Sequence, residues 1–221
     1  MGEINQRIIK TALITGATGL IGKQLLQLLL EDPFYEKVKA ITRKPIEIQN
    51  PKLENIVLNF DKLSEHAPAL KTDDVFCCLG TTIRIAKTKE AFRKVDYEYP
   101  LELARVTKNQ GAIQYLLVSA LGADKNSGIF YNKVKGEIEE AVGQISFHSL
   151  HIFRPSLLLG DRTEHRSGEG AATTFFKLFG FLIPEKYKAI DSGKVARAML
   201  TLAKEKKPGF YFHESKELQK Y

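Results

Sequence analysis

Three glycines stand between a short apolar run and a long leucine-rich run near the start of the chain. The segment reads TALITGATGLIGKQLLQLLL, with Gly16, Gly19 and Gly22 between ALIT and LLQLLL. Glycine inside a regular element costs about 0.5–1 kcal/mol relative to alanine, so a glycine cluster at a strand-to-helix junction indicates that the backbone approaches something closely. Such a turn directs backbone N–H groups and the positive end of the helix dipole towards a pyrophosphate. The alternative is a glycine turn that binds nothing.

The turn therefore predicts a dinucleotide-binding site. The residues of the turn that we expect to contact the cofactor are Gly16, Thr18, Gly19, Leu20, Ile21 and Gly22. The position of the motif, after the first expected strand and at the start of the first long helix, is what makes it informative.

Apolar runs rich in β-branched residues alternate with stretches of helical period along most of the chain. This alternation predicts an α/β fold with a doubly wound parallel sheet, the Rossmann fold. The expected strands are Ala12–Thr15, Val38–Thr42, Asn55–Leu58, Asp74–Leu79, Ala112–Ser119 and Phe147–Phe153, with Phe210–Phe212 as a late edge strand. The expected helices are Leu20–Glu31, Lys87–Gln110, Gly128–Val142, Ala171–Phe179 and Ser192–Lys204.

One of the expected helices should be interrupted. The helix expected over 87–110 should bend or split at Pro100, which cannot donate the usual backbone hydrogen bond, and Gly111 follows where a glycine cap ends a helix.

We expect one domain over residues 1–221, in which the glycine-rich, charged and aromatic residues 160–190 form a small C-terminal substrate lobe. Its charged run 161–166 either contacts an anionic group or pairs internally. Its apolar run 173–184 packs on the core, lines a pocket or forms a dimer contact.

Composition excludes several classes of protein. Hydrophobic residues make up 43% and charged residues 27% of the 221 residues, as in an ordinary globular protein. The apolar stretches are far shorter than the eighteen or so residues of a membrane span, and residues 1–10 lack the apolar core of a signal peptide, which predicts a cytoplasmic protein. The adjacent Cys77 and Cys78 are expected to be buried thiols, and the five histidines show no spacing typical of a metal site.

The net charge of +7 favours anionic partners without identifying them. A phosphate-rich cofactor fits this charge, and so does nucleic acid. No repeat of aromatic and basic residues supports nucleic-acid binding, so we expect a cofactor and a small-molecule substrate instead.

The residues about twenty positions beyond Gly22 indicate which cofactor binds. NAD-binding proteins place an acid there to bind the ribose 2′-hydroxyl, whereas this chain reads Ile41-Thr42-Arg43-Lys44. Two cations and no carboxylate suit a 2′-phosphate, which predicts a preference for NADP(H), with NAD(H) possible. Arg43 is the expected main contact, with Lys44 beside it. The alternative is an arginine that is merely solvated at a strand end.

Tyr131 and Lys135 are four residues apart in a predicted helix and therefore share one face. An ammonium stabilises a neighbouring phenolate, so Tyr131 could give or take a proton on a substrate oxygen. Ser119, at the end of the preceding strand, would hydrogen-bond the same oxygen and stabilise its developing charge. Lys135 would also hold the cofactor ribose. Tyrosine and lysine often occur at this spacing by chance, so the interpretation depends on the serine and the glycine turn.

Four segments in this order resemble an atypical short-chain dehydrogenase/reductase, within the branch of Tat-interacting-protein-like and NmrA-like NAD(P)-binding proteins. They are GATGLIG, LLVSALGAD, YNKVKGEIE and FRPSLLLGDRTEHRSGE, and the resemblance runs from about Lys10 to about Phe212. It implies further cofactor contacts: Asp61 at the adenine, Leu79, Gly80, Thr81 and Thr82 along the ribose and phosphates, Val118 with Ser119 beneath the nicotinamide, and Pro155, Ser156 and Leu157 at its carboxamide.

The chain departs from this family pattern in places. Asp96 stands where many relatives have an asparagine, and the residues after 160 are too few for a nucleotide-sugar lobe. The leading function is an NADP(H)-dependent oxidoreductase acting on an unknown carbonyl or alcohol. The alternative is an NADP(H)-binding regulator that senses the redox state without turnover, through a protein partner or as a homodimer.

Overall fold

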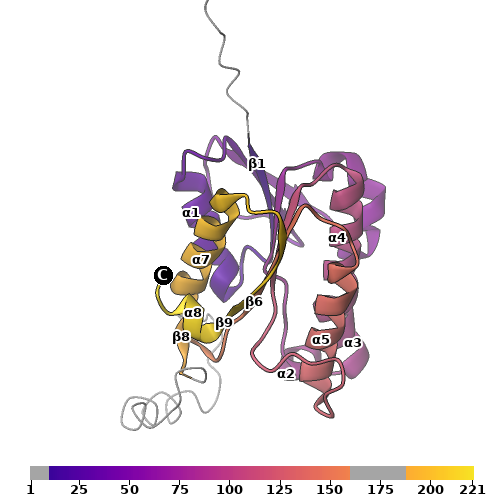
Figure 1. The fold of residues 1–221 in the computed structure, drawn as a ribbon. Coiled ribbons are helices and arrows are strands. Elements are labelled where there is room, and N and C mark those ends of the chain that lie inside the picture. Colours follow the sequence, from indigo (N-terminus) through magenta and orange to yellow (C-terminus); the bar gives the residue numbers. More distant parts are fainter. Residues whose placement is uncertain (1–9, 160–187) are drawn as a thin grey trace, which may run out of the picture.

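A computed structural model describes residues 10–159 and 188–221 of the chain. Within them, seven parallel strands form one sheet in the order β3-β2-β1-β4-β5-β6-β9 (Figure 1). They are β1 (Thr11–Thr15), β2 (Lys37–Thr42), β3 (Leu53–Val57), β4 (Asp74–Cys77), β5 (Gln114–Val118), β6 (Ser149–Arg154) and β9 (Gly209–Glu214). The order runs outward from β1 in both directions, which confirms the doubly wound parallel sheet. A separate pair joins β7 (Leu158–Leu159) to β8 (Ile190–Asp191).

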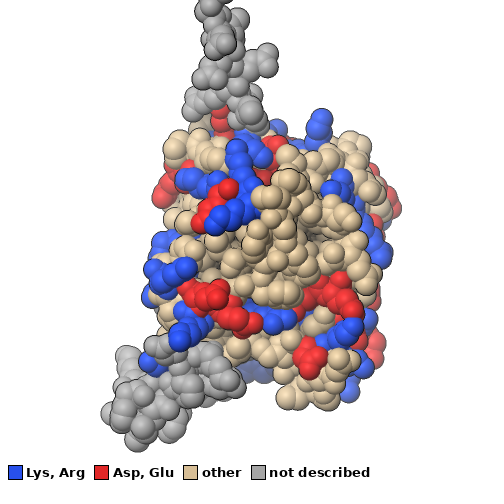
Figure 2. Space-filling view, in the orientation of Figure 1, with Lys and Arg blue, Asp and Glu red and all other residues tan. Residues whose placement is uncertain are grey.

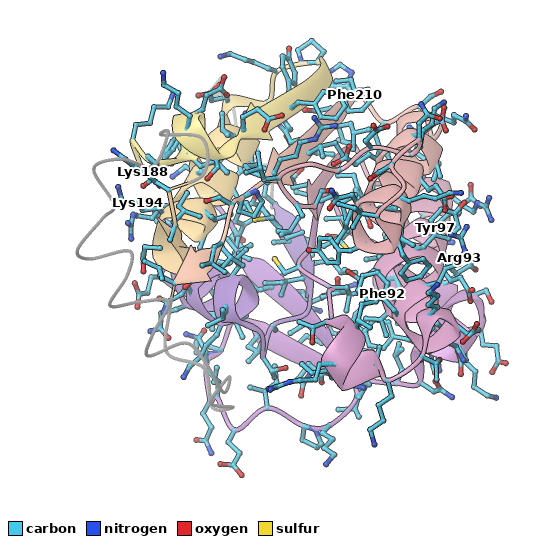
Figure 3. All side chains as sticks on the ribbon, turned by 90° about the horizontal axis from the view of Figure 1, so that it is seen from below. Phe92, Arg93, Tyr97, Lys188, Lys194 and Phe210 are labelled. Atoms are coloured by element: carbon cyan, nitrogen blue, oxygen red, sulfur yellow. The ribbon has the colours of Figure 1, made fainter. Side chains whose placement is uncertain are left out.

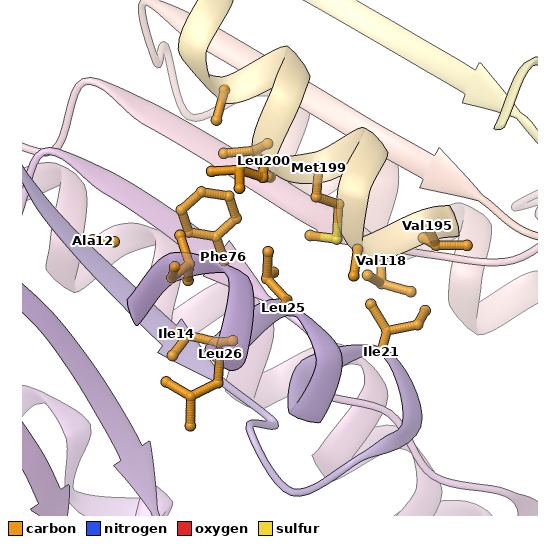
Figure 4. Packing of buried hydrophobic residues seen from close by; sticks show 14 of the residues in the cluster. Ala12, Ile14, Ile21, Leu25, Leu26, Phe76, Val118, Val195, Met199 and Leu200 are labelled. Carbon is orange, nitrogen blue, oxygen red and sulfur yellow. The ribbon is translucent and has the colours of Figure 1, made fainter. Parts of the chain in front are cut away.

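Helices cover both faces of the sheet, because alternate side chains of each buried strand point to opposite faces. On one face, Ala12 and Ile14 of β1 pack under α1 (Leu20–Glu31), α7 (Ser192–Glu205) and α8 (Ser215–Leu218). Figure 4 shows Leu25 of α1 and Met199 of α7 meeting near Phe76 in this layer.

On the other face, Leu13 of β1 packs under η1 (Phe60–Leu70), α4 (Tyr99–Asn109) and α5 (Phe130–Gly143). Full burial of one such leucine contributes about 1.5–3 kcal/mol, so the two layers together hold the strand ends at fixed positions.

The helix expected over 87–110 consists of three consecutive pieces. They are α3 (Lys89–Arg93), a π-helical turn η2 (Lys94–Glu98) and α4. The irregularity predicted from Pro100 is therefore present, but it lies just before the proline: the N–H of Tyr99 donates to the carbonyl of Lys94, five residues back. Pro100 stands in the first turn of α4, where its missing N–H costs little. Gly111 has a φ of 93° and follows α4 as the predicted cap.

Several boundaries differ from the predictions. β3 begins two residues before the predicted strand, β4 ends at Cys77 rather than Leu79, and β5 and β6 each begin two residues later than predicted. The turns of η1 and the short helices α2 (Ile83–Ala86) and α8 were not predicted. The helices α2 and α8 span four residues each, too few for a periodic apolar pattern. The turns of η1 are 3₁₀ turns with about three residues per turn, so their apolar residues do not recur at α-helical spacing, and they begin at Asn59, whose side chain accepts from the N–H of Asp61.

Some predictions concern residues outside the described ranges. These are the helix at 171–179, the charged and apolar runs and most of the predicted substrate lobe. Within the described ranges, both cysteines are free, Cys77 is buried and Cys78 half-buried. In the same part of the chain no helix combines the length and apolarity needed to cross a bilayer.

β9 closes one side of the sheet, as predicted for the late edge strand. Phe210 and Phe212 project from it with 46% and 44% of their surface exposed. Figure 2 shows a largely uncharged surface in front of β9. Around it, basic and acidic side chains of the described residues are intermixed.

Candidate active site

The glycine turn after β1 packs tightly against its neighbours. Gly16 has a φ of 74°, and a Cβ there would lie 2.3 Å from the carbonyl oxygen of Cys78. A Cβ on Gly22 would lie 2.0 Å from the carbonyl oxygen of Gly16. The first glycine therefore lets the turn lie against the end of β4, and the last lets α1 lie against the turn.

The start of α1 fits an anion. Gly19 is its N-cap, no side chain caps this end, and its first turn contains no acidic residue. The first N–H groups of a helix have no partner within the helix, and the helix dipole adds positive potential there. Thr18 and Gly19 are exposed at this point, with Leu20, Ile21 and Gly22 following in the helix. These features fit the predicted pyrophosphate contacts.

The part of the cofactor site that is predicted to bind the adenosine lies at β2 and η1. Arg43 and Lys44 follow β2 and are exposed, and neither side chain has an ion pair within the described ranges. Asp61 lies in the first turn of η1, where its carboxylate lies 2.7 Å from Nζ of Lys94 and accepts a hydrogen bond of 2.9 Å from the Tyr99 hydroxyl. These hydrogen bonds hold the pKa of Asp61 below its ordinary value. The predicted adenine contact must therefore share a carboxylate that already has two partners.

The loop after β4 is fixed by hydrogen bonds at both of its threonines. The N–H of Thr81 donates to Oδ2 of Asp96 over 2.8 Å, and the Thr82 hydroxyl accepts from the N–H of Ile85 and caps α2. Leu79 and Gly80 lead into this loop, and Gly80 borders the Asp96 and Lys135 side chains. The loop predicted to run along the ribose and phosphates is thus tied to the protein through Asp96.

Lys135 and Asp96 form a buried ion pair next to this loop. Nζ of Lys135 lies 2.8 Å from Oδ1 of Asp96, and the two residues are 4% and 1% exposed. Burial by itself lowers the pKa of Lys135, but the charges of Asp96 and Tyr131 outweigh it and raise this pKa well above its ordinary value. Lys135 therefore stays protonated at neutral pH.

Tyr131 stands one helical turn before Lys135 in α5. Its ring centroid is 5.6 Å from that of Phe92 in α3, which supports the phenol from the side. Because the Tyr131 phenol is among the charges that act on Lys135, the two side chains lie on the same side of α5, as their spacing predicts. Figure 3, which looks onto the carboxyl ends of the strands, shows Phe92 beside Arg93 and Tyr97 at the edge of this region.

Ser119 directly follows β5 and is 4% exposed. Its N–H donates to the carbonyl of Phe153, but its hydroxyl has no hydrogen-bond partner among the described residues. An unpaired buried hydroxyl costs about 1–3 kcal/mol, so such a group is usually satisfied by a ligand or water. This orphaned hydroxyl fits the predicted role of binding a substrate oxygen.

The strand ends β5 and β6 lie side by side at the predicted nicotinamide position. Val118 ends β5, and the N–H of Leu121 donates to the carbonyl of Pro155 over 2.9 Å. The Ser156 hydroxyl donates to the carbonyl of Lys188 and accepts from the Ser215 hydroxyl, so it is held by the C-terminal part of the chain. Leu157 is 42% exposed.

Sequence reasoning missed the importance of two residues. It treated Asp96 only as a substitution for a family asparagine, and it gave Phe92 no role. The two residues are four apart, F-x-x-x-D, a spacing that in a helix would put both on one face, but no local pattern indicates that this face meets Tyr131 and Lys135. Among the described residues, no group of three or more acidic, cysteine or histidine side chains could hold a metal ion.

Comparisons with known proteins agree with this geometry. A family model described as NAD(P)H-binding matches residues 16–158. Protein HTATIP2 of Rattus norvegicus is 40% identical over 198 residues, which span 86% of this chain and 80% of that protein. The mitochondrial protein FMP52 of Debaryomyces hansenii is 33% identical over 205 residues, or 88% of each chain.

Solved structures share the fold at lower identity. MoeE5 in complex with UDP-glucose and NAD superposes with a TM-score of 0.71 at 15% identity, over 91% of this chain and 74% of that one. The Helicobacter pylori ADP-L-glycero-D-manno-heptose-6-epimerase superposes with a TM-score of 0.70 at 18% identity, over 93% of this chain and 76% of that one. These likenesses show a common fold.

Proposed function

Since the chain belongs to the NAD(P)H-binding family, in the atypical short-chain dehydrogenase/reductase branch with HTATIP2 and FMP52, we propose that it is an NADP(H)-dependent oxidoreductase. It reduces a carbonyl or oxidises the corresponding alcohol. The observation that carries this proposal is the Ser119 hydroxyl, which has no hydrogen-bond partner among the described residues and lies at the same edge of the sheet as the glycine turn and the Tyr131–Lys135 pair. The fold alone would not support a reaction.

Each residue has a separate task. Bound nicotinamide supplies the hydride chemistry. Tyr131 gives a proton to the substrate oxygen or takes one from it, and the Ser119 hydroxyl donates a hydrogen bond to that oxygen. Lys135 keeps a positive charge beside the phenol and holds the ribose. The glycine turn and the start of α1 bind the pyrophosphate, which fixes the cofactor against the strand ends.

The Arg43 and Lys44 side chains support a preference for NADP(H) over NAD(H). Both are exposed cations at the end of β2 and are free to bind a 2′-phosphate. We expect Arg43→Ala to weaken NADPH binding about tenfold, the size of one lost charged contact, and to leave NADH binding unchanged. Calorimetry with the two cofactors checks this. Equal losses for both would mean that Arg43 does not bind the 2′-phosphate.

The surroundings of the site favour an apolar carbonyl compound. Exposed aliphatic side chains project from the elements that follow β4, β5 and β6, namely Ile83, Ile85, Ile129, Leu157 and Leu159. The panel of test substrates should therefore contain aldehydes and ketones with alkyl or aryl bodies of increasing size, together with small polar ones for comparison.

The decisive experiment combines this panel with Tyr131→Phe. Loss of the hydroxyl should reduce turnover at least a hundredfold because the proton donor is gone, while NADPH still binds with the wild-type affinity. Tyr97→Phe, a neighbouring tyrosine outside the proposed centre, serves as the matched control and should keep wild-type turnover. If NADPH binds and no carbonyl is reduced by the wild-type protein, the regulatory function replaces the enzymatic one.

Two further expectations accompany the proposal. A cytoplasmic location is predicted from the sequence, whereas the FMP52 relatives are named mitochondrial proteins. Fractionation of cells with an antibody to the protein distinguishes these compartments. A protein partner or a second copy of the chain belongs to the regulatory alternative and would be detected as a change in sedimentation when NADPH is added.

A further inference from the structure

We propose that Asp96 is a positioning residue for the reaction: one carboxylate oxygen holds the Lys135 ammonium, the other anchors the loop at 79–82, and its negative charge moderates the effect of Lys135 on Tyr131. This inference rests on the proposed function. It assigns a task to a residue that matches no catalytic or cofactor position predicted from the sequence.

The two oxygens of Asp96 face two different parts of the site. Oδ1 lies 2.8 Å from Nζ of Lys135, and Oδ2 accepts the Thr81 N–H over 2.8 Å. Lys135 belongs to the proposed catalytic pair, whereas Thr81 belongs to the loop that we expect along the cofactor. A single carboxylate thus fixes the distance between a catalytic side chain and a stretch of backbone predicted to bind cofactor. An asparagine could serve the N–H as well, but it could not neutralise the ammonium.

The backbone around Asp96 explains why its side chain reaches both partners. Asp96 is the middle residue of the π-turn η2, which packs against α5, the helix of Lys135. A π-turn inserts one extra residue into a helix and so changes the direction of the side chains within it, and such turns are frequent at functional sites. Gly80 adds no side chain between Asp96 and Lys135: a Cβ there would lie 3.6 Å from Oδ1 and 3.9 Å from Nζ.

Three charged or titratable groups among the described residues have the largest influence on Lys135. They are Asp96 from η2, Tyr131 from α5 itself and the buried thiol of Cys77 from β4. Asp96 is the carboxylate with the largest influence on this ammonium among the described residues. Seen from the Tyr131 oxygen, a paired ammonium and carboxylate act as a dipole, which stabilises a phenolate less than an isolated ammonium does. Removing the negative charge should strengthen the effect of Lys135 on the phenol.

The test compares Asp96→Asn with Asp74→Asn. Asp74 is a matched control because it is also buried and hydrogen-bonded, to the Tyr35 hydroxyl at 2.8 Å, but it stands at the opposite end of the sheet. For Asp96→Asn we expect the plateau of kcat/KM to fall about tenfold, because Lys135 is no longer held. In carbonyl reduction Tyr131 must be protonated, so the alkaline limb of the pH profile should move down by about one pH unit, because the phenolate is stabilised more. Asp74→Asn should change neither.

A second measurement does not depend on turnover. Calorimetry with NADPH should show binding weakened several-fold in Asp96→Asn, since the loop at 79–82 loses its charged anchor, and unchanged in Asp74→Asn. Should Asp96→Asn fail to fold, Asp96→Glu keeps the charge but moves it by one methylene. In that variant the plateau should fall while the alkaline limb stays in place.

The outcomes separate the two proposals. If the wild-type protein binds NADPH but reduces no carbonyl, the proposed function fails, and the calorimetric difference between the two asparagine variants still reports on the anchor. If the wild-type protein is active and Asp96→Asn keeps the wild-type pH profile and NADPH affinity, the positioning role is wrong. A fall in activity that only follows the fraction of folded protein would also contradict it.

Discussion

Two buried polar clusters in this protein hold nitrogen bases in opposite charge states. Beneath the loop after β4, Lys135 is protonated and paired with Asp96. Near the C-terminal end of α7, the buried His151 of β6 and the half-buried His213 of β9 lie beside each other and stay neutral. Burial disfavours charge at both places. The difference is the partner: a carboxylate in one cluster, a second imidazole in the other.

The histidine cluster is a chain of side-chain contacts. The Ser149 hydroxyl lies 3.0 Å from Nε2 of His151, and Nδ1 of His151 lies 2.8 Å from Nε2 of His213. Burial, and for His151 also the neighbouring His213, lowers the pKa of each imidazole to about 4. Protons on both rings would put an N–H on each of the two facing nitrogens and break the contact between them, whereas the proton on Lys135 makes its contact with Asp96. The comparison therefore shows that the two clusters should respond differently to mutation and to pH.

The largest expected effect comes from breaking the ion pair. Lys135→Met leaves the Asp96 carboxylate buried without its counter-ion, and loss of one partner of a buried pair costs about 3–5 kcal/mol of unfolding free energy. Urea denaturation at pH 7 without cofactor measures this. Lys133→Met is the matched control, because Lys133 is exposed on the same helix and its loss should change stability by less than about 0.5 kcal/mol. A loss below about 1 kcal/mol for Lys135→Met would contradict the comparison.

The second prediction concerns acid. A histidine has a pKa near 6.5 when unfolded and about 4 in this cluster, so the unfolded chain takes up protons first as the pH falls. The stability given by the neutral pair is complete above pH 6.5 and is lost between pH 6.5 and about pH 4, by up to about 3 kcal/mol for one ring. Urea denaturation at several pH values measures the slope.

The variant His151→Gln/His213→Gln isolates this contribution. It removes both titratable imidazoles, so its free energy of unfolding should fall less steeply over the same pH range. Its absolute stability is lower than that of the wild-type protein, because the contact with Ser149 is lost. The Lys135 contribution should not enter this slope, since a raised lysine pKa affects stability only as the pH rises above about 10.5. Parallel slopes for the variant and the wild-type protein would show that the histidines do not control acid stability.

The third prediction uses one buried serine from each region. Ser119→Ala removes a hydroxyl without a protein partner, so it should leave stability almost unchanged and lower turnover about a hundredfold, the usual cost of losing one donor to a developing oxyanion. Ser149→Ala removes the partner of His151, so it should cost about 1 kcal/mol of stability and leave turnover unchanged. Turnover and urea denaturation measured on both variants test whether one serine affects only activity and the other only stability. The same loss of activity in both would refute it.

The comparison also shows which features the sequence could predict. The glycine turn and the alternation of strands and helices are local patterns, and the fold class and the sheet were predicted from them, whereas the family was identified from the resemblance of four segments. The Asp96–Lys135 pair joins two helices 39 positions apart, and it depends on a π-turn that helical periodicity does not reveal. The histidine contact joins residues 62 positions apart in adjacent strands, so no sequence spacing indicates it. Packing decides such contacts, and local propensity does not.

The central position of β1 has a consequence for synthesis of the protein. Among the described strands β1 is made first, but it pairs on one side with β4, whose residues are made about 60 positions later. At the usual elongation rate of about 5–20 residues per second, this strand waits about 3–12 s for that neighbour. During this interval the apolar stretch from Thr11 to Thr15 has only β2 to pair with, so a chaperone that binds nascent chains should be needed most before Cys77 emerges.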